Sequence, residues 1–176
     1  MPIILAFDGR SPRIAASAII APNAVLVGDI EIGESTSIWF GAVLRADFAP
    51  IRVGAGCNIQ DNAVLHGDAP GKGLTIEDRV TIGHGAIVHC AWVGQGCLIG
   101  MGAIVLSGSR IGSGSFVAAG SVVREDAQIP PSMLVAGNPA MSKSSLTGRA
   151  AEWVATSAAE YLKLAPRYRE QFRAAG

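Results

Sequence analysis

Charge is scarce in this chain of 176 residues, and neither sign is in excess. Charged residues make up 16% of the sequence, and its 14 basic side chains equal its 14 acidic ones in number. A chain without net positive charge lacks the electrostatic attraction that non-specific binding to nucleic acid or to an anionic membrane requires. The sequence has no run of about 18 apolar residues, so it predicts no transmembrane helix. We therefore expect neither nucleic acid nor membrane as a partner.

Cysteine is also scarce. The three cysteines (Cys57, Cys90 and Cys97) are odd in number and form no Cys-x-x-Cys pair, which favours reduced thiols over a disulfide framework. The first residues, Met1–Asp8, lack the basic region and the length of a secretory signal peptide. Both features predict a cytoplasmic protein.

Glycine and aliphatic residues are abundant, and they recur with a fixed period. The chain has 22 glycines and is 49% hydrophobic. An aliphatic residue returns every sixth position over most of the chain, and a small residue usually follows it four positions later. The aliphatic positions are Ile14, Ile20, Leu26, Ile32, Ile38 and Leu44, then Val53, Ile59 and Leu65, then Ile76, Ile82 and Val88, and finally Val93, Ile99, Val105, Ile111, Val117, Val123, Ile129 and Val135.

A period of six over residues 12 to 140 is the hexapeptide signature of an all-β fold, the left-handed parallel β-helix. Three hexapeptides make one coil of a triangular prism, with the aliphatic residue inside and the small residue at the corner. Stacked coils lie about 4.8 Å apart, so residues one coil apart form columns on one face. We predict a β-helix domain over residues 1–141 and a C-terminal helix and tail over residues 142–176.

Two segments interrupt or end this repeat. Gly67–Gly73 has turn composition throughout and predicts a loop that leaves the coil. Thr147 is a suitable N-cap for a helix that continues through Leu164 and is expected to stop at Pro166. Beyond it, three arginines predict a solvated basic end: Arg167, Arg169 and Arg173.

The only three histidines lie close together in this repeat. If the glycine-rich loop is an insertion of about five residues, coil counting places Arg45, His66 and His89 in one outward column. The same count places Asp61 and His84 in a column on the preceding face, beside Gln60. Two imidazoles one coil apart are about 5 Å apart at their backbones, which suits two ligands of one metal at about 2.0–2.1 Å each.

His84 lies around a corner from the other two histidines and cannot easily reach their metal within one subunit. Packing three prisms side by side removes this conflict, because a cyclic trimer closes a head-to-tail contact and creates three equivalent sites. We therefore predict a homotrimer with a metal at each subunit interface. In it, the face with Arg45, Asp47, His66 and His89 meets the neighbouring face with Gln60, Asp61 and His84.

Four runs of sequence make the chain similar to a known family: Ser37–Asp47, Asn58–His66, Ile82–His89 and Leu98–Ala103. In these runs, and in the tail Tyr161–Tyr168, the chain resembles the gamma class of carbonic anhydrases along nearly its whole length. The resemblance implies a trimer in which two histidines of one subunit and one of its neighbour hold the metal. Here His66 and His89 would form the pair, and His84 would come from the neighbour.

The resemblance also implies the reaction, reversible hydration of CO2 to bicarbonate. Zn2+ held by three neutral histidines lowers the pKa of its water from 15.7 to about 7 and so supplies hydroxide at neutral pH. Fe2+ or Co2+ could occupy the same nitrogen ligands. The residues that match the family's polar site and interface positions are Arg45, Asp47, Gln60, Asp61 and Tyr161.

Each of these residues has an expected role. Gln60 would orient the nucleophile or the substrate by a hydrogen bond, and Asp61 would accept a proton or orient His84. Arg45 would pair with Asp47 or Asp61 at the interface, where a charge must be paired. Tyr161 would border the pocket or serve in packing only.

Two departures from the family pattern keep other functions open. Phe48 follows Asp47 where active members carry an acidic proton shuttle, and the loop after His66 offers only Asp68. Cys90 stands where the family commonly has glycine. The alternatives are a coenzyme A-dependent hexapeptide acyltransferase, which needs an unligated histidine as general base, and a catalytically weak structural homologue.

Overall fold

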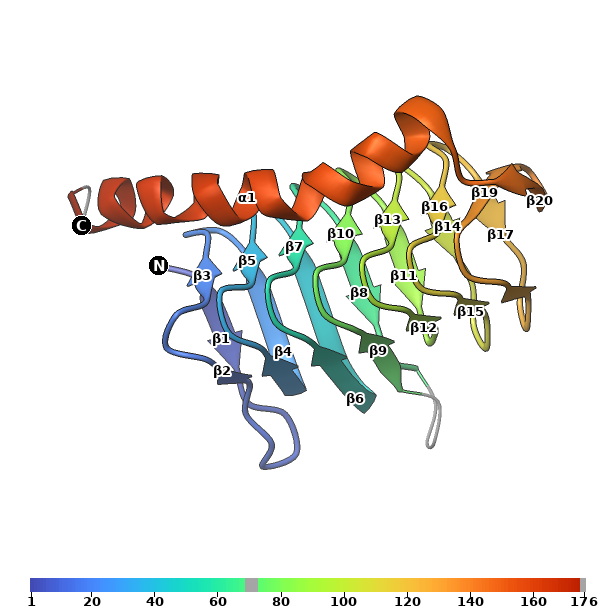
Figure 1. The fold of residues 1–176 in the computed structure, drawn as a ribbon. Helices are drawn as coiled ribbons and strands as arrows, with labels where there is room; N and C mark the ends of the chain where they lie inside the picture. Colours follow the sequence, from blue (N-terminus) through green and yellow to red (C-terminus); the bar gives the residue numbers. More distant parts are fainter. Residues whose placement is uncertain (69–72, 175–176) are drawn as a thin grey trace.

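The structure is a computed structural model that describes residues 1–68 and 73–174. Its short parallel strands stack into a left-handed β-helix of about 7 turns, with one long helix along its side (Figure 1). The predicted fold is therefore confirmed.

The strands form two hydrogen-bonded sheets. The larger sheet covers two faces of the prism, which are connected through the long strand β6, and its members are β1 (Ile3–Leu5), β2 (Arg13–Ile14), β4 (Val25–Ile32), β6 (Val43–Val53), β8 (Val64–His66), β9 (Leu74–Ile76), β11 (Ile87–His89), β12 (Trp92–Val93), β14 (Ile104–Val105), β15 (Arg110–Ile111), β17 (Val122–Val123) and β18 (Gln128–Ile129). The smaller sheet is the third face and contains β3 (Ile19–Ile20), β5 (Ser37–Ile38), β7 (Asn58–Ile59), β10 (Thr81–Ile82), β13 (Leu98–Ile99), β16 (Phe116–Val117), β19 (Met133–Gly137) and β20 (Ala140–Ser145).

The strand register reproduces the predicted columns. Leu44 pairs with Leu65, Leu65 with Val88, and Val88 with Val105, each one coil further along. All four side chains are fully buried in the aliphatic core. The six-residue period therefore sets which residues face inward, and the insertion after His66 lies where the count placed it.

The predicted loop Gly67–Gly73 lies partly outside the described residues, which omit positions 69–72. On its far side the chain rejoins the coil at once, because Leu74 begins β9 and pairs with Ile51 of β6. At the other end of the repeat, β20 (Ala140–Ser145) pairs antiparallel with β19. The sheet therefore continues past residue 141, where we predicted that the β-helix domain ends.

Helix α1 (Gly148–Ala174) lies against the smaller sheet and runs back towards the first coil (Figure 1). Its 27 residues span about 40 Å, comparable to the height of the coil stack. The helix is anchored by an aromatic cluster around Ile19, Trp39 and Ala165, which are buried. The side chains packed against these three are Phe40, Tyr161, Leu164, Tyr168 and Phe172.

The prediction that the helix ends at Pro166 is wrong, because α1 continues through this proline. Proline removes one backbone donor and strains the preceding turn. The residues on both sides nevertheless pack as one helical face, since Tyr161 and Tyr168 both contact the ring of Trp39, with centroid distances of 5.2 and 5.0 Å. Tertiary packing of the helix therefore outweighs the tendency of proline to end it.

The expectation of a wholly solvated basic end is also wrong for Arg169. Its guanidinium donates hydrogen bonds to the main-chain oxygens of Ser17 and Ala18 and so ties α1 to the first coil. Arg167 is exposed, as expected, and the side chain of Arg173 lies outside the described part of the chain. Among the residues described, no helix is both long and apolar enough to cross a membrane.

Candidate metal centre

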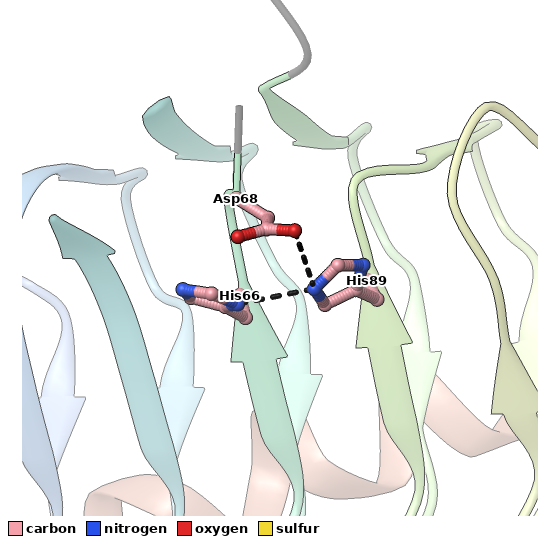
Figure 2. Close-up of side chains that lie close together, drawn as sticks. All are labelled: His66, Asp68 and His89. Carbon is pink, nitrogen blue, oxygen red and sulfur yellow. Dashed lines mark hydrogen bonds and ion pairs between the residues drawn. The ribbon is translucent and has the colours of Figure 1, made fainter. Parts of the chain in front are cut away.

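Two histidines meet on the outer surface of the larger sheet. His66 ends β8 and His89 ends β11, and the two residues are direct partners in the strand register. Nδ1 of His66 lies 3.1 Å from Nε2 of His89 (Figure 2). The side chains are 12% and 28% exposed, so the pair is partly desolvated.

The outer nitrogens of both rings have hydrogen-bond partners. Nε2 of His66 lies 3.0 Å from Oδ1 of Asp47, and Nδ1 of His89 lies 2.8 Å from the hydroxyl of Ser107. A carboxylate can only accept, so the His66 proton belongs on Nε2 and its Nδ1 presents a lone pair. A hydroxyl can also accept, which allows the His89 proton to sit on Nδ1. Both inner nitrogens can then turn lone pairs towards the same point.

This arrangement fits a tetrahedral metal. Two nitrogens bound at 2.0–2.1 Å to such an ion are about 3.3 Å apart, close to the observed separation. Outer hydrogen bonds of this kind fix the tautomer and the orientation of ligating histidines. Within the described residues, the donor atoms of His66, His89 and Asp68 all lie within 4.8 Å of one another.

Asp47 connects His66 to Arg45. Its other carboxylate oxygen forms an ion pair with the Arg45 guanidinium, so Asp47, and not Asp61, is the partner of Arg45 within the chain. Burial raises the pKa of the Asp47 carboxyl, but hydrogen bonds from His66, the Asp47 backbone and Arg45 outweigh it and leave this pKa below its ordinary value. Asp47 is therefore a carboxylate at neutral pH and remains an acceptor for His66.

His84 lies on a different face, as the coil count predicted. It follows β10 of the smaller sheet, and the described donor atoms that cluster around His66 and His89 do not include it. Its Nδ1 is 2.7 Å from Oδ2 of Asp61, one coil earlier, and its side chain is 45% exposed. Within one chain, then, Asp61 orients the His84 ring, which is partly exposed to solvent.

Gln60 lies beneath this turn and is 7% exposed. Its side-chain oxygen accepts from the backbone N–H of His84 at 3.1 Å, and its amide nitrogen donates to Asn58 at 3.1 Å. Asn58 in turn donates to Thr81, whose hydroxyl is 3.0 Å from that of Ser157 on α1. The sequence did not reveal this buried polar chain, which links the helix to the position of His84.

Tyr161 packs its ring against Trp39 under α1. Burial, then the nearby charge of Asp61, raises the pKa of the Tyr161 phenol, which therefore keeps its proton at neutral pH. Tyr161 can donate a hydrogen bond near Asp61 but cannot serve as a base there.

Sequence reasoning missed Ser107 and left the role of Cys90 open. The register pairs Val88 with Val105, so the column of His89 continues to Leu106, and Ser107 reaches the His89 ring from the turn that follows Leu106. Cys90 is buried with φ at 46°, a backbone conformation that glycine adopts most readily. Its sulfur accepts a hydrogen bond from the backbone N–H of Asp68 at 3.0 Å, so it supports the loop that follows His66.

An apolar groove of about 720 Å³ opens beside His84, between α1 and the smaller sheet. Met101, Phe116 and Trp153 supply much of its lining, and Gln60 and His84 form its polar end.

Known proteins are similar to this chain in both sequence and fold. The bacterial transferase hexapeptide family (six repeats) matches residues 90–125. A Methanocaldococcus jannaschii protein named probable carbonic anhydrase is 44% identical over 151 residues, which are 86% of this chain and 94% of that protein. The mitochondrial gamma carbonic anhydrase 2 of Arabidopsis thaliana is 40% identical over 164 residues. The chain belongs to the gamma carbonic anhydrase family.

The extent of these matches differs among members of the gamma carbonic anhydrase family. The chain spans little more than half the length of some relatives, 59% for the Arabidopsis protein and 54% for a Geobacillus kaustophilus carbonic anhydrase that is 50% identical over 99 residues.

A crystal structure of a Bacillus cereus protein, named as a candidate acetyltransferase, superposes with a TM-score of 0.93 at 37% identity and covers 97% of this chain and 98% of that one. Proteins with this fold are therefore named both as carbonic anhydrases and as acetyltransferases.

Proposed function

We propose that the protein is a gamma-type carbonic anhydrase that hydrates CO2 reversibly to bicarbonate with a zinc ion at each interface of a homotrimer. The observation that carries this proposal is the separation of 3.1 Å between Nδ1 of His66 and Nε2 of His89, each ring held from outside by its own partner. His66 and His89 would supply two ligands, and His84 of a neighbouring subunit the third.

The trimer accounts for the placement of His84. The side chain is half exposed, faces away from the other histidines and is already oriented by Asp61. A histidine in this position could bind a metal held by a neighbouring subunit. In a cyclic trimer, every subunit would provide His84 to one neighbour and receive the His84 of the other. Arg45, which is 46% exposed and paired with Asp47, lies on the face that would receive it.

A zinc ion held by His66, His89 and a neighbour's His84 would activate water as the nucleophile at neutral pH. Asp47 and Ser107 keep the ring protons of His66 and His89 on their outer nitrogens. Gln60 fixes the backbone of His84, and the second proton of its side-chain amide is available to orient CO2 or the nucleophile. Asp61 orients the His84 ring, and Tyr161 remains a hydrogen-bond donor beside Asp61.

The proton released in each turnover must reach solvent. Asp68 is the more exposed of the two acidic side chains beside the histidine pair, at 53% against 14% for Asp47. A single carboxylate without a second acid at position 48 predicts turnover limited by proton export at low buffer concentration.

Two further parts of the proposal are the metal and the compartment. Zn2+ is proposed, with Fe2+ or Co2+ as alternatives for the same nitrogen ligands. Three unpaired cysteines are compatible with a reducing compartment, and we propose the cytoplasm.

The test is metal analysis of protein purified with and without oxygen, together with the initial rate of CO2 hydration. About one metal ion per chain and a hydration rate that His89→Ala abolishes support the proposal. Wild-type protein that carries metal but hydrates CO2 no faster than His89→Ala would instead identify a homologue without this activity.

Acyl transfer is the second candidate, favoured by the apolar groove beside His84 and by the name of the Bacillus cereus protein. It needs a histidine that acts as general base and a cofactor such as coenzyme A. Saturable binding of acetyl coenzyme A to metal-free protein, measured by calorimetry, would support it, and binding only of metal would count against it.

A further inference from the structure

A carboxylate of the same chain lies over the histidine pair. Oδ2 of Asp68 is 3.8 Å from Nε2 of His89, and the donor atoms of the two histidines and Asp68 form one group within 4.8 Å. Figure 2 shows the Asp68 side chain beside both rings, on the outer side of the strands. One chain thus brings three groups of metal-ligand type together without any contribution from His84.

The backbone around Asp68 is fixed by its neighbours. Gly67 passes so close to β6 that a Cβ added there would lie 2.5 Å from the backbone oxygen of Ala49, which only glycine avoids. Its N–H donates to the oxygen of Arg45 at 3.3 Å. The next N–H, that of Asp68, donates to the sulfur of Cys90. The main chain therefore places Asp68 at the site, while its half-exposed side chain remains free to rotate.

Two imidazoles and one carboxylate are a ligand set that Zn2+ and Fe2+ both accept. Oxygen and nitrogen ligands of a tetrahedral ion are about 3.3 Å apart, so the Asp68 side chain would have to rotate to shorten the 3.8 Å to His89 and bring the whole group, now within 4.8 Å, around one ion. A carboxylate also offsets part of the charge of a divalent cation, which two neutral histidines do not.

We propose that Asp68 is a metal ligand, so that one chain holds the ion through His66, His89 and Asp68 even when no His84 reaches it. The proposal rests on the proposed metal site of His66 and His89 and adds a ligand to it. In the trimer, Asp68 and His84 together would complete four protein ligands and close the site to water, whereas release of Asp68 opens the position that catalysis needs.

The test is a titration of metal-free protein with Co2+, followed by its visible absorption. His84→Ala removes the ligand from the neighbour, and His84→Ala/Asp68→Asn also removes the carboxylate. His84→Ala/Asp8→Asn is the matched control, because Asp8 is exposed in a turn far along the chain from the site. Circular dichroism of each metal-free variant verifies the fold, and Asp68→Asn in the wild-type background gives a second comparison.

We expect His84→Ala and its Asp8 control to bind about one Co2+ per chain with similar affinity. His84→Ala/Asp68→Asn should bind at least about 10- to 100-fold more weakly, since loss of an outer partner alone costs that much. Its absorption spectrum should change in intensity, as should that of Asp68→Asn.

Equal affinities and spectra with and without Asp68 would overturn the proposal and leave the His66–His89 site intact. A slower CO2 hydration of Asp68→Asn with an unchanged Co2+ spectrum would also overturn it, because Asp68 would then be a proton acceptor only. Failure of the wild-type protein to bind Co2+ would instead remove the proposed function itself.

Discussion

Ser107 and His89 form a hydrogen bond of 2.8 Å on the side of the imidazole opposite to His66. A serine hydroxyl both donates and accepts, so this contact allows the His89 proton to sit on either nitrogen. When a metal binds Nε2, Ser107 can accept the proton on Nδ1. In the sequence Ser107 lies 18 residues after His89, at the turn that follows Val105 and Leu106.

Removal of the hydroxyl should weaken metal binding. We expect Ser107→Ala to lower the affinity for Zn2+ about 10- to 100-fold, because His89 loses the group that holds its tautomer. Ser107→Thr keeps a hydroxyl and should stay close to wild type. Competition with a chromophoric chelator measures the affinity, and nitrogen NMR of His89 reports the tautomer. Equal affinities for all three proteins would contradict this role.

Replacing Asp61 by asparagine should impair catalysis more than folding. In Asp61→Asn the side-chain oxygen can still accept from the backbone N–H of Phe40, as Oδ1 does now at 3.1 Å. The amide NH2 that replaces Oδ2 can only donate to Nδ1 of His84, which moves the ring proton to Nε2, the nitrogen proposed to bind the metal. We expect CO2 hydration to fall about 10- to 100-fold while the melting temperature stays near wild type. A large loss of stability with normal turnover per folded chain would assign Asp61 a structural role.

The ion pair of Asp29 and Arg52 should make stability depend on pH. Arg52, whose guanidinium Nη1 lies 2.8 Å from Oδ1 of Asp29, lowers the pKa of the Asp29 carboxyl below 3.8 more than any other influence. Its stabilisation is therefore present above about pH 4 and is lost as the pH falls through the lowered pKa of the folded state. Asp29→Asn should melt below wild type at pH 7, and the gap should close as the pH falls below 3.8 through the lowered pKa of the folded state. A gap that is constant with pH would exclude this explanation.

The aromatic cluster under α1 should contribute much of the free energy that holds this helix against the sheet. Trp39→Ala removes a buried ring that contacts both Tyr161 and Tyr168, so we expect a loss of about 3–5 kcal/mol in the free energy of unfolding. Trp153→Ala is the control, because Trp153 is 49% exposed and contacts Phe116 at the other end of the helix. Urea denaturation compares the two. Similar losses for both variants would contradict the importance of the Trp39 cluster.

The β-helix could be predicted because its repeat is encoded locally. An aliphatic residue recurs every sixth position within each run, and once the glycine-rich loop is counted as an insertion this period gives the inward positions from Leu44 to Val105. The pairing of His66 with His89, and the separate face of His84, follow from the same count. A six-residue period with identifiable interruptions therefore converts sequence spacing into position in space.

What the sequence did not predict depends on side-chain contacts between segments far apart in the chain. The continuation of α1 through Pro166 depends on rings that pack against Trp39, more than 120 positions earlier. The anchoring of Arg169 depends on backbone oxygens of the first coil. Ser107 and Asp68 reach the histidines only through the way their turns leave the coil, which the six-residue period does not specify.

The most direct test of the proposed site is complementation between two inactive variants. His89→Ala lacks a ligand of the paired site, and His84→Ala lacks the ligand given to the neighbour. Neither should hydrate CO2 alone. Co-assembled in equal amounts, they should regain about a quarter of the wild-type hydration rate per chain, because random cyclic trimers place an intact pair beside an intact His84 at about that frequency. No recovery in trimers shown to contain both variants, or full activity of His84→Ala alone, would contradict a site shared between subunits.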